Sequence, residues 1–140
     1  MSIWRVDLAR NIVKRVVFIT SHYLESAGKA GFHHLAESFW RAGWQVLFFT
    51  ESVSWLTLLR RCDPRCRYPL LREAHRLRQV RERLTSYVWL TPFHPISLRW
   101  PTLNRMSAPL WSRYASFSFG GAEVEIKQAD LFVFDSDSAH

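Results

Sequence analysis

The chain has 140 residues, the length of one domain, and 48% of them are hydrophobic. That fraction is too high for a disordered protein and is sufficient for a buried core. The formal net charge of +7 favours an anionic partner: nucleic acid, an anionic lipid surface or a phosphorylated substrate. No stretch reaches the ~18 apolar residues of a membrane-spanning helix, and residues 1–13 lack the apolar core of a signal peptide.

The first half of the chain has the pattern of a β-α-β unit. Residues 14–20 and 44–50 are nearly continuous apolar runs, which is typical of strands buried on both faces of a parallel sheet. Between them, apolar side chains recur at helical spacing, and Gly43 marks the expected end of that helix. The apolar positions are Phe32, Leu35, Ala36, Phe39 and Trp40.

The second half predicts two more buried strands, over residues 86–90 and 130–135. Short helical segments are expected around 103–114, and a further helix around 123–129. Four apolar strands separated by helices indicate an α/β domain, a Rossmann-like layer with a mostly parallel sheet.

The end of the sequence also carries a signal. Ser136 and Asp137 follow the last predicted strand and are natural N-caps for a helix, but the body of that helix is absent. Because α/β sheets need helices on both faces, we expect residues 1–140 to be a single, truncated domain.

An arginine-rich segment, residues 60–84, holds nine arginines against three acidic residues and is expected to form an amphipathic insertion. From Leu70 to Leu84 the apolar residues share one face of a helix, while Arg72, Arg76 and Arg83 lie elsewhere. Such a basic helix is typical of binding to an anionic membrane surface. A solvated helix that packs its apolar face on the sheet explains the same pattern, and both interpretations stay open.

The loop at residues 21–31 is the best candidate for a binding site. Ligands of open α/β sheets bind at the carboxyl ends of strands, and a glycine-containing loop before a helix can hold an anion through backbone N–H groups. The spacing of Gly28 and Gly31 fits neither a dinucleotide fingerprint nor a Walker A loop. His22 can transfer a proton or donate a hydrogen bond to a substrate, unless it is a loop histidine satisfied by backbone groups.

No metal site is predicted. Cys62 and Cys66 are the two cysteines of the chain, with His75 the only further ligand near them, so we expect free thiols in a reducing compartment. Asp135 and Asp137 follow the last strand, where helix capping is a simpler explanation than cation binding.

Several short motifs, in their order and spacing, resemble a known family over nearly the whole chain. They are Thr20-Ser21-His22, Lys29-Ala30-x-x-His33, Phe48-Phe49, Tyr87-x-Trp89, His94-Pro95, Arg99, Tyr114 and residues 129–136. The chain is similar to the N-terminal domain of the GumK family, the β-glucuronosyltransferases of xanthan-type polysaccharide assembly.

This resemblance implies the N-terminal, acceptor-side half of a GT-B fold. It implies an acceptor made of a polyprenyl-diphosphate-linked oligosaccharide, met at the cytoplasmic face of the plasma membrane, and an inverting, metal-free transfer. The residues expected to bind the acceptor are His22, Lys29, His33 and His94.

The same resemblance places the rest of the reaction outside this chain. A UDP-glucuronate donor would bind a C-terminal domain, so no cofactor is expected within residues 1–140. The catalytic carboxylate would lie beyond His140, so the chain alone is expected to be inactive.

Two other functions stay open. A membrane-recruiting subunit would complete a split glycosyltransferase with a separate catalytic chain. A nucleic-acid-binding module would use the positive charge, but no RNA-recognition or zinc-finger pattern supports it, so no nucleic-acid partner is expected. Residues 62–84 match the family poorly, which leaves the acceptor glycan and the donor sugar open.

Overall fold

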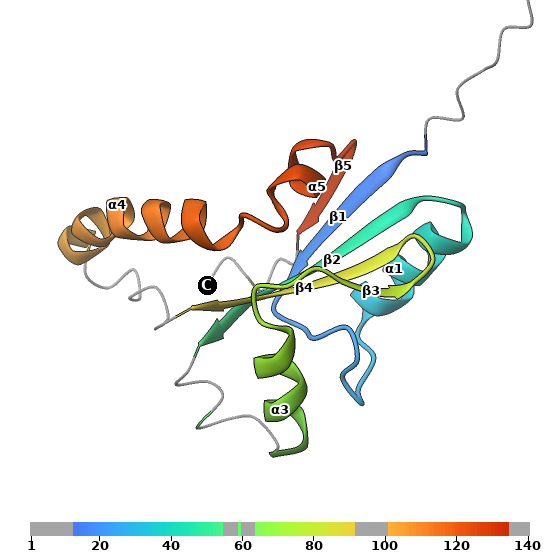
Figure 1. The fold of residues 1–140 in the computed structure, drawn as a ribbon, viewed down its shortest axis with the longest axis horizontal. Coiled ribbons are helices and arrows are strands. Elements are labelled where there is room, and N and C mark those ends of the chain that lie inside the picture. The colour runs from blue at the N-terminus through green and yellow to red at the C-terminus, as the bar shows by residue number, and fades with distance from the viewer. Residues whose placement is uncertain (1–12, 55–58, 60–63, 92–100, 135–140) are drawn as a thin grey trace, which may run out of the picture.

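The structure is a computed structural model, and it describes residues 13–54, 59, 64–91 and 101–134. A five-stranded sheet forms its centre, with the strand order β3-β4-β2-β1-β5 (Figure 1). All neighbouring strands pair in parallel except β3, which is antiparallel to β4. The mostly parallel α/β layer predicted from the sequence is therefore confirmed. The strands are β1 (Arg15–Thr20), β2 (Gln45–Ser54), β3 (Arg78–Arg81), β4 (Leu84–Thr91) and β5 (Leu131–Phe134).

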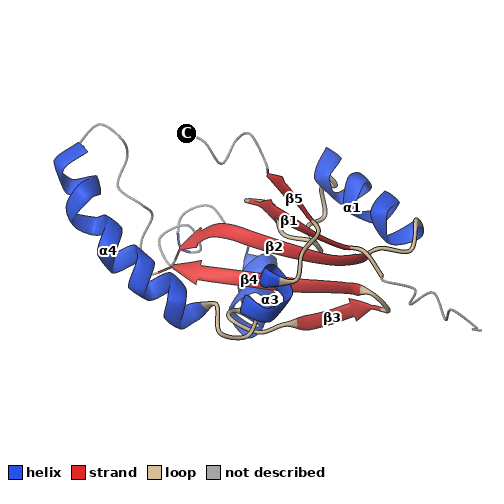
Figure 2. Ribbon diagram, turned by 90° about the horizontal axis from the view of Figure 1, so that it is seen from above, coloured by secondary structure: helices blue, strands red, loops and turns tan. Residues whose placement is uncertain are grey.

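Helices lie on both faces of this sheet (Figure 2). On one face, α1 packs through Ala36 against a buried cluster around Phe18, and α3 packs through Leu70 against Val88. On the other face, α5 and the end of α4 cover a second cluster around Tyr87. The helices are α1 (Gly31–Arg41), α3 (Pro64–Glu73), α4 (Pro101–Ser118) and α5 (Glu123–Lys127).

The β-α-β unit predicted in the first half is confirmed. β1 and β2 pair in parallel, and β2 continues to Ser54, beyond its predicted end. α1 ends where Gly43 adopts a φ of 89°, and the Trp44 N–H donates to the Phe39 carbonyl at 3.1 Å, which closes the last turn. Leu35, expected on the apolar face, is instead 42% exposed.

The amphipathic helix predicted from Leu70 to Leu84 is wrong. α3 ends at Glu73, the chain turns at His75, whose φ is 57°, and it then returns as β3 in an antiparallel hairpin with β4. The apolar residues that suggested one helical face therefore belong to a helix, a turn and two strands. The hairpin is favoured because β3 satisfies backbone groups at the edge of β4, which a helix would leave unpaired.

Two further predictions need correction. The short helical segments expected around 103–114 form one helix, α4, which continues through Pro109. β5 is also not a buried strand: among the described residues it pairs with β1 alone, and Phe132 and Phe134 are 40% and 64% exposed. An apolar run identifies a strand but does not say whether a second strand or helix covers it.

Candidate functional site

The strand order reverses beside β1, which locates the expected ligand site. From β1 the chain proceeds to β2 and then to β4 on one side, whereas β5 returns to the other side of β1. Open α/β sheets bind their ligands at such a switch point, outside the carboxyl ends of the strands. The loop between β1 and α1, residues 21–30, starts at this point. The structure thus puts the candidate loop where the sequence analysis expected it.

His22 is an exposed residue of this loop, two positions after the end of β1. Its backbone N–H donates to the Thr20 hydroxyl at 3.1 Å, and its carbonyl accepts a hydrogen bond from the Thr50 hydroxyl at 3.0 Å. Both threonines are fully buried, Thr20 at the end of β1 and Thr50 beside it within β2. The main chain of His22 is therefore fixed by the sheet, while its imidazole faces the surface.

His33, the second predicted acceptor residue, is buried and braces the loop from inside. Its Nδ1 accepts the backbone N–H of Ala30 at 3.0 Å, so the neutral ring carries its proton on Nε2. That Nε2–H donates to the Tyr23 carbonyl at 2.8 Å. Both ring nitrogens are engaged by backbone groups, so His33 shapes the loop. A direct contact of His33 with an acceptor stays a prediction.

Lys29 also lies on the loop and is exposed, with its ammonium donating to the Leu24 carbonyl at 2.7 Å. An ammonium has three N–H donors, so this contact leaves capacity for an anion. The structure therefore places His22 and Lys29 on one loop, with His33 in the first turn of α1 behind it. His94, the fourth predicted residue, lies outside the described residues.

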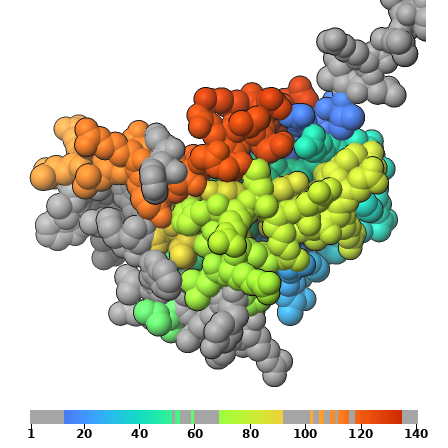
Figure 3. All heavy atoms as spheres, in the orientation of Figure 1, coloured from blue at the N-terminus to red at the C-terminus, as the bar shows by residue number. Residues whose placement is uncertain are grey.

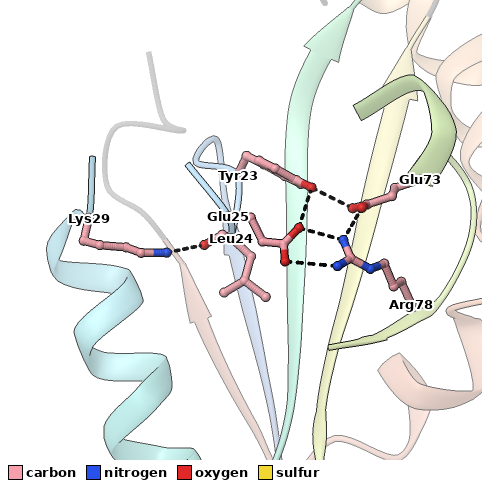
Figure 4. A network of polar contacts seen from close by, with 6 residues as sticks. All are labelled: Tyr23, Leu24, Glu25, Lys29, Glu73 and Arg78. Atoms are coloured by element: carbon pink, nitrogen blue, oxygen red, sulfur yellow. Dashed lines mark hydrogen bonds and ion pairs between the residues drawn. The ribbon is translucent and has the colours of Figure 1, made fainter. Parts of the chain in front are cut away.

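A polar network that the sequence analysis missed holds the loop against α3 and β3 (Figure 4). The Arg78 guanidinium binds the Glu25 carboxylate with both amino groups, Nη1 to Oε2 at 2.7 Å and Nη2 to Oε1 at 3.0 Å. Arg78 also pairs with Glu73, and the Tyr23 hydroxyl lies 2.9 Å from a Glu73 oxygen. These residues are distant in sequence, so no local motif indicates the network.

The network also sets the protonation states of its members. The hydrogen bond from Arg78 is the main cause that holds the pKa of the Glu25 carboxyl below its ordinary value. Burial, followed by the hydrogen bond to Glu73, raises the pKa of Tyr23 far above its usual range. Glu25 therefore remains ionised and Tyr23 protonated near neutral pH, which is the combination that the contacts require.

The three arginines predicted to bind a membrane do not share one face. Arg72 lies in the last turn of α3 and Arg76 in the turn before β3, and each is exposed beside an exposed leucine, Leu71 and Leu77. Arg83 lies in the turn between β3 and β4 with a φ of 63°. An extended strand of this length separates Arg76 from Arg83 by on the order of 20 Å.

The helix with an exposed apolar stripe is α4, which the sequence analysis did not single out. Met106 and Leu110, one turn apart, are 69% and 65% exposed, and the exposed Arg105 and Arg113 flank them. The space-filling view shows α4 at one edge of the molecule (Figure 3). The sequence signal was a run without acidic residues from 101 to 118. Among the described helices, none is long and apolar enough to cross a membrane.

Metal binding gains no support within the described part of the chain, where no group of three possible metal ligands occurs. Cys62, Asp135, Asp137 and the side chain of Cys66 lie outside the described residues.

Fold and site together define a Rossmann-like α/β domain whose candidate ligand loop follows β1 at the switch point of the sheet. Residues 18–140 match the model of the N-terminal domain of glucuronosyltransferase GumK, and the chain belongs to that family. Comparison with the curated proteins finds no match. The family confirms the resemblance noted in the sequence, and it makes this chain a glycosyltransferase-type domain.

Proposed function

We propose that this domain is the acceptor- and membrane-binding half of an inverting GT-B glycosyltransferase. Its substrate would be a polyprenyl-diphosphate-linked oligosaccharide of exopolysaccharide synthesis, met at the cytoplasmic face of the plasma membrane. The observation that carries the proposal is the exposed His22 at the switch point of a domain from the GumK family. A UDP-sugar, with glucuronate as the expected sugar, and the catalytic carboxylate would belong to a second domain.

The chemistry of the loop suits a diphosphate. An anion near the carboxyl end of β1 would meet the imidazole of His22 and the ammonium of Lys29, which can both donate hydrogen bonds to phosphate oxygens. The buried threonines and His33 fix the main chain before any ligand arrives. Less conformational entropy is then lost on binding than with a mobile loop.

Two described surfaces support contact with an anionic membrane. The first combines Arg72 and Arg76 with the exposed Leu71 and Leu77 around the end of α3. The second is the exposed face of α4, where Arg105 and Arg113 flank Met106 and Leu110. Each basic residue near an anionic leaflet contributes about 1 kcal/mol, and apolar side chains insert at the headgroup level. A few such residues are sufficient for reversible binding at the membrane surface.

Vesicle binding tests the acceptor part of this proposal. The chain is sedimented with phosphatidylcholine vesicles that contain either undecaprenyl diphosphate or phosphatidylglycerol at equal surface charge. We expect tighter binding to the diphosphate lipid, and we expect His22→Ala to remove that preference without unfolding the domain. His34→Ala is the matched control, because His34 is an exposed histidine of α1 that is not among the residues expected to bind the acceptor. Equal binding to both vesicles by the wild-type chain would contradict the proposal.

A further inference from the structure

A concave site lies between the loop after β1 and β3, on the face of the sheet that α1 covers, and residues 24–26 and Lys29 of the loop line it. It is a cleft of about 410 Å³ between α1 and β3, a volume within the range of small-molecule sites. The buried Leu24, Ala36 and Leu84 contribute apolar walls. Lys29 lines it before the start of α1, and Trp40 near the end of that helix, which spans about 16 Å over its 11 residues. An elongated ligand would therefore fit better than a compact one.

The charged side chains of this cleft favour an anionic ligand. Its two carboxylates are already neutralised by arginines that do not line it: Glu25 pairs with Arg78 at 2.7 Å, and Glu37 pairs with Arg41 at 2.8 Å. Arg81 also lines the cleft and is exposed, and within the described part of the chain it forms no ion pair.

The second cation of the cleft, Lys29, attracts Glu25 through space but forms no ion pair among the described residues. Its ammonium is held by the Leu24 carbonyl. The net charge available to a ligand in the cleft is therefore positive, and it comes from Lys29 and Arg81.

Trp40 supplies a rigid aromatic wall next to the positive charge. Its indole N–H donates to the Glu82 carbonyl at 2.6 Å, which fixes the ring. The Arg81 guanidinium lies over the ring, 5.3 Å from its centroid. The polar side chains of Ser26 and His34 line the same cleft and can bind hydroxyl groups. A fixed aromatic ring among hydroxyl-binding groups and a cation suits a sugar that carries a negative charge.

We propose that this cleft binds an acidic saccharide, an oligosaccharide with a hexuronate or a similar carboxylate-bearing sugar, and that Arg81 and Lys29 face its carboxylate. The choice of a saccharide rests on the glycosyltransferase role proposed above, whereas the preference for an anion rests on the charges of the cleft. Transfer of a glucuronosyl group creates such a carboxylate on the acceptor. The cleft would then hold a uronate-bearing product or a segment of the growing polymer.

Titration with a matched pair of sugars tests this inference. The probes are a trisaccharide that ends in β-glucuronate and the same trisaccharide ending in β-glucose, with binding followed by the NMR signal of the Trp40 indole N–H. We expect the acidic sugar to bind at least about tenfold more tightly, because a charge-assisted contact is lost with the neutral sugar. Arg81→Gln should remove most of that difference, and Glu37→Gln should tighten binding of the acidic sugar. Lys127→Gln, the same charge loss on α5, should change nothing.

Three results would overturn the inference: equal binding of both trisaccharides, inorganic phosphate binding as tightly as the acidic trisaccharide, or an Arg81→Gln variant that is folded and binds like the wild type. Because Arg81 is exposed on an edge strand, we expect the Arg81→Gln variant to fold, and circular dichroism checks this.

The outcome is separable from that of the vesicle experiment. Arg81→Gln should keep the preference for the diphosphate lipid, whereas His22→Ala should keep the binding of the acidic sugar. In the wild-type chain, a missing diphosphate preference alone would overturn the proposed function, and a missing preference for the acidic sugar alone would overturn the present inference.

Discussion

Arg78 connects the loop after β1 to α3 and β3 through the carboxylates of Glu25 and Glu73. The pair with Glu25 is partly exposed, with 38% and 42% of the two side chains accessible to solvent, so solvent screening keeps its energy small. Glu73 is 12% exposed and would be left without its cation in an Arg78 variant. We therefore expect Arg78→Gln to lower the free energy of unfolding by about 1 kcal/mol. The larger effect would be on the shape of the ligand loop.

The lowered pKa of Glu25 predicts a specific pH dependence of stability. A carboxyl whose pKa is lower in the folded than in the unfolded state stabilises the fold above the unfolded-state pKa, and this stabilisation is lost as the pH falls through the folded-state value. The ordinary value is 4.5. The stability difference between wild type and Glu25→Gln, measured by urea unfolding, should therefore be constant above about pH 5 and shrink below pH 4.5.

The control for this experiment is the same substitution in an Arg78→Gln background. The hydrogen bond from Arg78 is the main cause of the pKa shift, so the pH-dependent part should be greatly reduced there. If the stability difference caused by Glu25→Gln depended on pH equally strongly without Arg78, the network would not be the source of that dependence.

At the level of secondary structure, the β3–β4 hairpin changes which arginines can act together. Arg72 and Arg76 lie on either side of the end of α3, each beside an exposed leucine, whereas Arg83 lies in the turn at the far end of β3. We expect Arg72→Gln with Arg76→Gln to weaken binding to phosphatidylglycerol vesicles about tenfold or more, because two contributions of about 1 kcal/mol are lost.

Arg83→Gln is the matched control for that variant, since it removes one exposed arginine from the same segment. It should leave vesicle binding nearly unchanged in a co-sedimentation assay. If Arg83→Gln weakened binding as much as the double variant, the membrane surface would include the opposite end of the hairpin, as the sequence pattern first suggested.

For the whole molecule, β5 is an edge strand of the described sheet with exposed aromatic side chains. Phe132 and Phe134 stack on each other with ring centroids 6.3 Å apart, and both are exposed. Exposed apolar edge strands promote association with another strand. We expect the isolated chain to self-associate with rising concentration. Phe134→Lys should raise the midpoint concentration of association about thirtyfold, because burial of a phenylalanine contributes about 2 kcal/mol.

Size-exclusion chromatography with light scattering measures this association. Val124→Lys is the control, because Val124 is 59% exposed on α5 rather than on the edge strand. A wild-type chain that stays monomeric at every concentration, or a Val124→Lys variant with the same effect, would show that β5 is not the contact.

Much of the candidate site was predictable from local sequence. The loop after β1 follows from an apolar strand, a glycine-containing stretch and a helix, and the family resemblance pointed to His22, Lys29 and His33. The Arg78 network was not predictable, because it joins segments far apart in the chain. Tyr23 and Glu73, for example, are separated by 50 positions. The internal role of His33 also required the structure, since exposed and buried histidines look alike in a sequence.

By itself, the sequence determined the mostly parallel α/β class, the first β-α-β unit, the position of the candidate ligand loop and the resemblance to the GumK family. These features depend on runs and spacings of side chains whose partners lie within one or two elements. Only the tertiary structure decided that residues 78–81 form a strand, that β5 is an exposed edge and that Arg72 and Arg83 lie apart. Each of these depends on which strand edge or sheet face remains uncovered. That outcome is set by hydrogen bonds between strands that are distant in sequence.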